Sequence, residues 1–102
     1  MEMHDAKRVS IVIEAPLESR LAAALTKAGV TGYTIMPVIG GSGRSGQWTR
    51  DGQVGRSGMV NFICLIKPER LDGLLEAAFA VVEPHIGVVS VTDAQELRAE
   101  RF

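Results

Sequence analysis

Hydrophobic and polar residues follow two patterns in this chain, and a strand pattern followed by a helix pattern occurs twice. In residues 8–15, RVSIVIEA, apolar residues fall at every second position, which is typical of a β-strand with one buried face. Residues 16–29, PLESRLAAALTKAG, carry a stripe of leucine and alanine at helical spacing between a proline and a glycine. The nearly continuous apolar run at 59–67 and the helical stripe at 68–82, which Pro68 opens, repeat this order.

Two further strands complete the pattern, YTIMPVI at 33–39 and GVVSVTD at 87–93. Pro37 has no amide hydrogen for a ladder hydrogen bond, so the strand containing it should lie at a sheet edge or at a bulge. The charged tail of the chain, AQELRAERF, fits a short strand or a short helix. The order predicts one α+β domain over residues 1–102. It is a ferredoxin-like βαββαβ fold with an antiparallel four-stranded sheet and both helices on one face.

The second face of this sheet has no helix left to cover it. Its expected outward positions include apolar residues such as Val12, Ile35 and Val88. A monomer would expose that face to water, so the pattern predicts oligomerisation.

Between the second and third strands lies a glycine-rich segment, VIGGSGRSGQWTRDGQVGRSG at 38–58, which holds seven of the 11 glycines. Its composition would suit disorder, but a loop of about 19 residues within a compact domain is usually functional. It lacks the ending of a phosphate-binding P-loop and no helix follows it, which excludes a P-loop and a dinucleotide fingerprint. A backbone nest for an anion, formed by Gly40, Gly41 and Gly43 beside the guanidinium of Arg44, remains. Trp48 is interpreted as a partner anchor or as a lid over a ligand.

Composition and charge narrow the function classes. The net charge of −1 on 102 residues favours neither nucleic acid nor a membrane surface. The polar start and the absence of a long apolar run predict a cytoplasmic protein without direct membrane insertion. The single cysteine, Cys64, is expected to be an inert core residue. His4 and His85 are far apart in sequence, and His85 is interpreted as a polar turn residue or a ligand contact. No catalytic residue, catalytic cofactor or metal site is predicted.

A family resemblance rests on GVTGYTIMPVIGGSGRSGQ at 29–47. This stretch resembles the G-x-T-G-x-T-x-x-x-V-x-G-x-G-R junction of the PII signal-transduction superfamily, and the element order of nearly the whole chain fits as well. The resemblance implies a homotrimer that binds adenine nucleotides in the clefts between subunits. It also implies a regulatory rather than an enzymatic role, in which a mobile T-loop, here at about 40–58, engages a partner protein.

The resemblance also implies the residues of the nucleotide site. Gly32 and Thr34 correspond to the adenine side, and Ile13 would line the base. Gly40, Gly43 and Arg44 correspond to the loop base around the phosphates, with the register open by one because Gly41 or Ser42 is inserted. The full set of candidates is Ile13, Gly32, Thr34, Gly40, Gly41, Ser42, Gly43, Arg44, Ile66, His85, Gly87, Arg98 and Arg101.

Departures from the family pattern refine this expectation. The family's lysine-rich second phosphate loop is reduced to EPHIGVV at 83–89, the modifiable tyrosine is absent, and Ser45 stands where glutamine begins the 2-oxoglutarate–magnesium site. The chain is therefore similar to divergent PII-like proteins linked to inorganic carbon and carboxysomes. Expected ligands are AMP or ADP ahead of ATP or cyclic AMP, with bicarbonate as co-ligand at Gly41, Ser42, Gly43 and Arg44. The expected partner is a bicarbonate transporter or a carbon-fixation protein, contacted by Trp48, Arg50 and Arg56.

Three alternatives remain open at this point. One is a small ferredoxin-like enzyme that binds an anionic substrate through Arg44, but no nucleophile or general base accompanies it. Another is a nitrogen-type PII regulator. A nucleic-acid-binding sheet face is disfavoured, because only five aromatic residues are present and the chain is slightly acidic.

Overall fold

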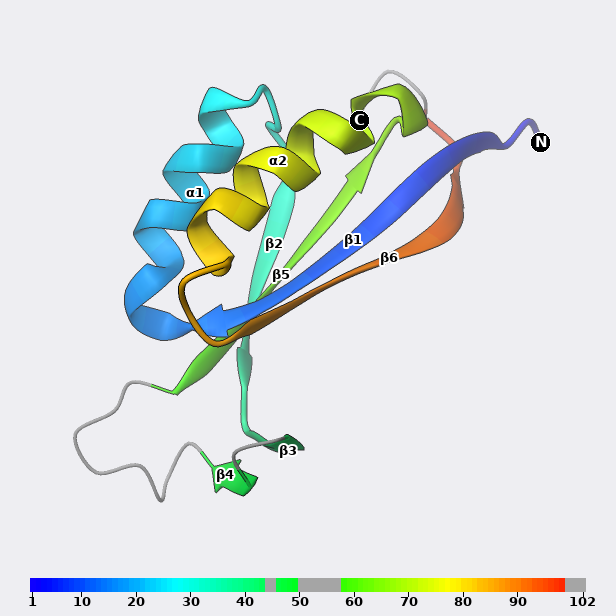
Figure 1. Cartoon of the computed structure of the whole chain (residues 1–102). Helices are drawn as coiled ribbons and strands as arrows, with labels where there is room; N and C mark the ends of the chain where they lie inside the picture. Colours follow the sequence, from blue (N-terminus) through cyan, green and yellow to red (C-terminus); the bar gives the residue numbers. More distant parts are fainter. Residues whose placement is uncertain (44–45, 50–57, 99–102) are drawn as a thin grey trace.

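The computed structural model of the chain describes residues 1–43, 46–49 and 58–98. Figure 1 shows the helices and strands of these segments. Their bounds are β1 (His4–Glu14), α1 (Glu18–Lys27), β2 (Tyr33–Val38), β3 (Gly40–Gly43), β4 (Gly46–Thr49), β5 (Met59–Ile66), α2 (Leu71–Val82) and β6 (Gly87–Glu96). Short 3-10 turns at Ala15–Leu17 and Pro68–Arg70 precede the two helices.

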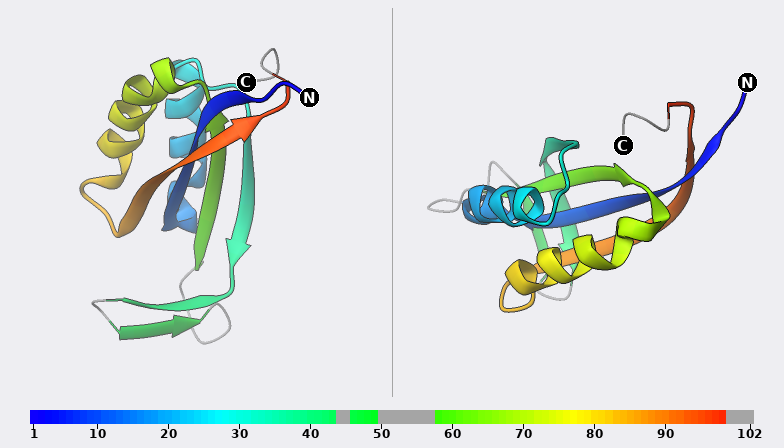
Figure 2. Two further views of the ribbon diagram at one scale, coloured as in Figure 1. Left: turned by 90° about the vertical axis from the view of Figure 1, so that its right-hand side faces the viewer. Right: turned by 90° about the horizontal axis from the view of Figure 1, so that it is seen from above.

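The described strands form a four-stranded sheet of order β2-β5-β1-β6, in which all neighbours are antiparallel. Both helices lie on one face of this sheet (Figures 1 and 2). The α+β ferredoxin-like fold predicted from the sequence is therefore confirmed. Pro37 lies in β2 at an edge of the sheet, as expected. The charged tail continues β6 to Glu96, so its first residues are strand rather than helix.

The core lies between the sheet and the two helices. Alternate residues of the central strands β1 and β5 point into it, and Phe62 is fully buried beside the ring of Tyr33, with ring centroids 5.4 Å apart. From the helices, Leu21, Leu25 and Leu74 are fully buried. The helical spacing of these leucines therefore did place them on the covered face, as the sequence pattern predicted.

The sequence predicted three apolar residues on the open face of the sheet, and two of them lie there. Val12 and Val88 face each other across β1 and β6 there, and Val88 is 63% exposed. The prediction for Ile35 is wrong, because it lies opposite Phe62 in the β2–β5 register and packs against the core. Alternation divides the residues of a strand between two faces, but it does not identify which face the helices cover; the register with β5 does.

The strands β3 and β4 form a separate two-stranded hairpin that projects from the end of the sheet (Figure 2). Gly41 lies opposite Trp48, and Ser42 opposite Gln47. The predicted nest of Gly40, Gly41 and Gly43 is wrong, because a nest needs successive residues in alternating turn conformations, whereas these residues form β3. Of the described glycines, only Gly29 and Gly58 have positive φ.

Candidate functional site

One group of candidate residues gathers at the end of the sheet from which the hairpin projects. Ile13, near the end of β1, pairs with Gly87 at the start of β6. The amide of Ala15 donates a hydrogen bond of 2.9 Å to the carbonyl oxygen of Gly58, which ties the end of the glycine-rich segment to the same place. His85 is exposed just before Gly87, and its amide donates to the carbonyl oxygen of Val82. We call this end of the sheet the loop end.

Packing within the protomer explains two of these candidates. The side chain of Ile13 is fully buried in the core, so it presents no side-chain surface to an adenine base in this protomer. A Cβ atom at Gly87 would lie 2.8 Å from Cγ1 of Val82 and 2.9 Å from the carbonyl oxygen of Val12. Glycine is therefore required at position 87 by the close approach of both α2 and β1 to it, whatever else it contacts.

A second group lies at the opposite end of the sheet, which we call the far end. Gly32 precedes β2, and Thr34 is exposed on the open face. No heavy atom lies within 4 Å of the place where a Cβ of Gly32 would be, so the packing of this protomer does not demand glycine there. Ile66 is buried at 5% exposure. Arg98 follows β6, and its amide donates to Oε1 of Glu96 over 3.1 Å.

The strand register separates the two groups along the sheet. Ile13 pairs with Val60, whereas Lys7 pairs with Ile66, six residues further along β5. At roughly 3.3 Å per residue, the two ends are about 20 Å apart. The structure therefore does not bring the candidates together into one pocket within a protomer.

Several candidates are not placed by the structure. Arg44, Arg50, Arg56 and Arg101 lie outside the described residues. Only the main chain of Trp48 is described, as part of β4. The anion and partner contacts assigned to these residues therefore stay predictions.

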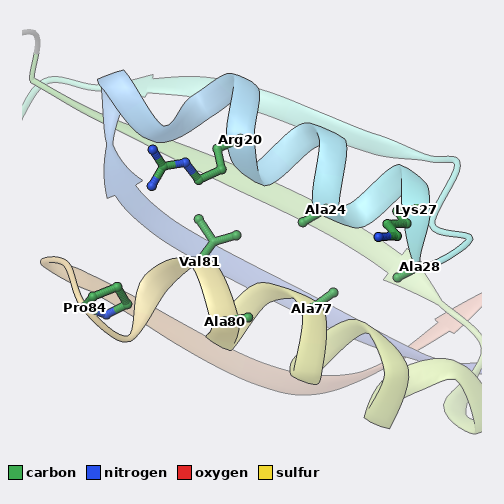
Figure 3. A pocket seen from close by; sticks show the side chains of 8 residues that line it. All are labelled: Arg20, Ala24, Lys27, Ala28, Ala77, Ala80, Val81 and Pro84. Atoms are coloured by element: carbon green, nitrogen blue, oxygen red, sulfur yellow. The ribbon is translucent and has the colours of Figure 1, made fainter.

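Two hollows of the described surface are lined by none of the candidate residues. The first is a groove of about 320 Å³ between the helices (Figure 3), with the cations Arg20 and Lys27 along α1. Its lining residues are Arg20, Ala24, Lys27, Ala28, Ala77, Ala80, Val81 and Pro84. The second, of about 690 Å³, lies at the far end around Lys7 and Asp93.

Lys7 and Asp93 form an ion pair across β1 and β6, with Nζ 2.6 Å from Oδ1. The hydrogen bond from Lys7, with its charge, lowers the pKa of the exposed Asp93 carboxyl.

We expect Lys7→Met to raise the pKa of Asp93 toward its ordinary value. Because the folded-state pKa is depressed, the small stabilisation from the pair is present at neutral pH and is lost as pH falls through the lowered pKa. A carboxyl-carbon NMR titration measures the change, with Lys27→Met as the control. An unchanged Asp93 pKa in Lys7→Met would contradict the ion pair.

No catalytic chemistry is apparent in the described part of the chain. Cys64 is fully buried, and burial raises the pKa of its thiol to about 11, so it is an inert core residue, as expected. Among the described residues, no three His, Cys, Asp or Glu side chains gather in a way that could hold a metal ion. None of the described helices combines the length and apolarity that crossing a bilayer requires.

The comparison with protein families decides the identity of this fold. The family model for nitrogen regulatory protein P-II matches residues 6–101. The chain belongs to the P-II family. It is a PII-like regulatory protein, and the resemblance inferred from residues 29–47 is confirmed.

Solved structures of PII-like proteins are similar to this P-II family member over nearly their whole length. CPII from Thiomonas intermedia K12, a nitrogen regulatory PII-like protein bound to ADP, AMP and bicarbonate, is 28% identical. That match has a TM-score of 0.88 and covers 99% of this chain and 96% of CPII. A second CPII structure, bound to ADP and bicarbonate, is 30% identical with a TM-score of 0.86, and the match covers 99% and 97% of the two chains.

A PII-like signalling protein from Thermus thermophilus shares the fold at 24% identity, with a TM-score of 0.78 and coverage of 100% and 99%. No curated protein matches the chain significantly.

One contact in this P-II protein was not anticipated from its sequence. Nη1 of Arg70 donates a hydrogen bond of 2.9 Å to the carbonyl oxygen of Gly29. The sequence feature that could have indicated this contact is the position of Arg70 immediately before α2. The helix dipole disfavours a cation there, so its side chain is expected to have a partner elsewhere. The β3–β4 hairpin was missed as well, because glycine-rich segments lack the alternation that marks strands.

Proposed function

We propose that this protein is a homotrimeric sensor that binds an adenine nucleotide in the clefts between its subunits, with bicarbonate as a co-ligand. In this proposal, the T-loop at about 40–58 reports the ligand state to a partner such as a bicarbonate transporter or a carbon-fixation protein. CPII, which is similar over nearly the whole chain, binds ADP, AMP and bicarbonate. The projection of the hairpin away from the sheet also supports a role in partner contact (Figure 2).

The observation that carries the proposal is the separation of the two candidate groups. The loop end offers Gly40, His85 and Gly87, whereas Gly32 and Thr34 lie at the start of β2. Thr34 pairs with Ile63, which lies opposite Ser10, three residues along β1 from Ile13, so Thr34 is roughly 10 Å from the loop end along the sheet, and Gly32 is further away. A cleft between subunits can join the loop end of one protomer to the far end of the next. The open apolar face around Val12 and Val88 supplies a surface for such an assembly.

Charge at the loop end favours a short phosphate chain. The connection from Glu83 to Gly87 contains no lysine or arginine, and its ionisable residues are Glu83 and His85. This connection therefore provides no lysine or arginine to bind a γ-phosphate. We propose that AMP and ADP bind at least as tightly as ATP, through the main chain of the loop end and the guanidinium of Arg44.

For bicarbonate, we propose Arg44 and the hydroxyl of Ser42 as the principal donors. Within the described hairpin, β3 pairs with β4 alone, so the main-chain amides on the other edge of β3 have no ladder partner there and can donate to an oxyanion. The planar guanidinium of Arg44 suits a planar carboxylate-like anion. Its charge would also offset the repulsion between bicarbonate and a nearby phosphate.

Bicarbonate is expected to raise the affinity for ADP, and Arg44→Ala is expected to reduce this coupling. We expect an enhancement of at least about fivefold, at the lower end of typical couplings. Calorimetric titration of ADP, with bicarbonate and with chloride at equal ionic strength, measures it. The same instrument then titrates bicarbonate with and without ADP, since linkage requires an equal factor in both directions.

Arg56→Ala is the matched control, because it removes an arginine from the same loop at a position assigned to the partner. It should leave both affinities unchanged. If bicarbonate has no effect on ADP binding, the coupled switch is wrong and a simple nucleotide sensor remains. A strong preference for ATP in the same titrations would contradict the interpretation of the connection 83–87.

A further inference from the structure

A single side chain ties the connection between α1 and β2 to the start of α2. Arg70 is the last residue of the second 3-10 turn, and its guanidinium donates to the carbonyl oxygen of Gly29 over 2.9 Å. Gly29 follows the C-cap of α1, 41 positions before Arg70 in the sequence. The contact therefore links the two halves of the domain at the far end of the sheet.

The connection has two further anchors, and both lie in its first half. Gly29 ends α1 with φ +86°, and the amide of Val30 donates to the carbonyl oxygen of Leu25 over 2.9 Å, as in a Schellman motif. Val30 is buried at 4% exposure. Thr31 and Gly32 are exposed, and the space beside Gly32 is open. Two glycines in four residues leave this backbone much conformational freedom, which the contact from Arg70 restricts.

The stability of α2 does not account for an arginine at this place. Arg70 is the N-cap residue of α2, where the positive end of the helix dipole favours an anion, and its side chain makes no capping hydrogen bond. The guanidinium lies instead at the C-terminal end of α1, where the carbonyl groups carry partial negative charge. The charge of Arg70 therefore serves the α1–β2 connection and not its own helix.

We propose that Arg70 is a positioning residue for the nucleotide site, acting through Gly29. It holds residues 29–32 so that Gly32, and Thr34 after it, keep the geometry in which they meet the adenine base. This inference rests on the proposed nucleotide function and assigns Arg70 no contact with the nucleotide. Because the phosphates would be bound at the loop end, Arg70 should affect the base end of the site alone.

The test compares ADP and AMP affinities by calorimetry in three variants. Arg70→Met keeps the length of the side chain but removes the donor, and it is expected to weaken ADP and AMP binding by the same factor, about fivefold. The ratio of the two affinities should stay as in the wild type, because the phosphate contacts are unchanged. Arg70→Lys keeps a cation and a donor and should recover most of the affinity. Arg20→Met removes an exposed arginine of α1 that makes no side-chain hydrogen bond with the described residues, and should have no effect.

Thermal melting establishes that each variant is folded at the titration temperature. Wild-type affinity in a folded Arg70→Met protein overturns the role of Arg70 while leaving the nucleotide site intact. A change in the ratio of ADP to AMP affinity also overturns it, since the effect would then reach the phosphates. A wild-type protein that binds neither nucleotide overturns the proposed function itself, and the positioning role with it.

Discussion

Val88→Asp is expected to turn the proposed trimer into folded monomers and to abolish ADP binding. Val88 is 63% exposed in the protomer and pairs with Val12 on the open face of the sheet, opposite the face that the helices cover. If this face is the subunit interface, the substitution buries an unpaired carboxylate in every subunit, at roughly 3–5 kcal/mol each. Sedimentation velocity at micromolar concentration measures the change in mass, and circular dichroism reports whether the protomer stays folded. ADP binding should be lost together with the assembly, because the candidate groups lie at opposite ends of the sheet.

Ala23→Asp is the matched control for this experiment. Ala23 is exposed on α1, on the side of the domain that the helices cover, so the same new charge should leave the mass unchanged. A wild-type protein that sediments as a monomer would overturn the trimer directly. A Val88→Asp protein that keeps the wild-type mass would show that the open face around Val88 is not the interface.

Gly87→Ala is expected to lower the free energy of unfolding by about 2 kcal/mol, as overpacking of a well-packed site does. The new Cβ would lie 2.8 Å from Cγ1 of Val82, which a rotamer change can relieve, but also 2.9 Å from the carbonyl oxygen of Val12, which belongs to a central strand. Backbone of β1 or β6 must therefore move. Urea denaturation without nucleotide measures the loss, and it separates this packing role from any role of Gly87 in binding phosphate.

Gly73→Ala is the control that makes this result interpretable. Gly73 lies within α2, and no heavy atom is within 4 Å of the place where its Cβ would be. Alanine there should raise the free energy of unfolding by about 0.5–1 kcal/mol, because glycine is disfavoured inside helices. Equal effects at both positions would show that backbone entropy, and not the contact with Val12, governs the response at Gly87.

Much of the fold was predictable because its determinants are local. The prolines at 16 and 68 mark the two strand-to-helix junctions, and the leucine stripes gave the covered face of each helix. The missing amide hydrogen of Pro37 predicted an edge strand, and β2 is one. The glycine-rich segment was harder, since glycine permits a nest and an extended strand equally, and only pairing with β4 selects the strand.

The sequence by itself determined the order of the two helices and the four strands of the main sheet, the helix faces and the family, since each depends on spacing within a short segment or on the motif at 29–47. The tertiary structure decided which face of the sheet each residue of β2 meets, because this depends on its register with β5, and Ile35 was misplaced for that reason. It also decided that Ile13 is core and that Gly32 and Gly87 lie at opposite ends of the sheet. Contacts between residues far apart in sequence, such as Arg70 with Gly29, exist only once the two halves pack together.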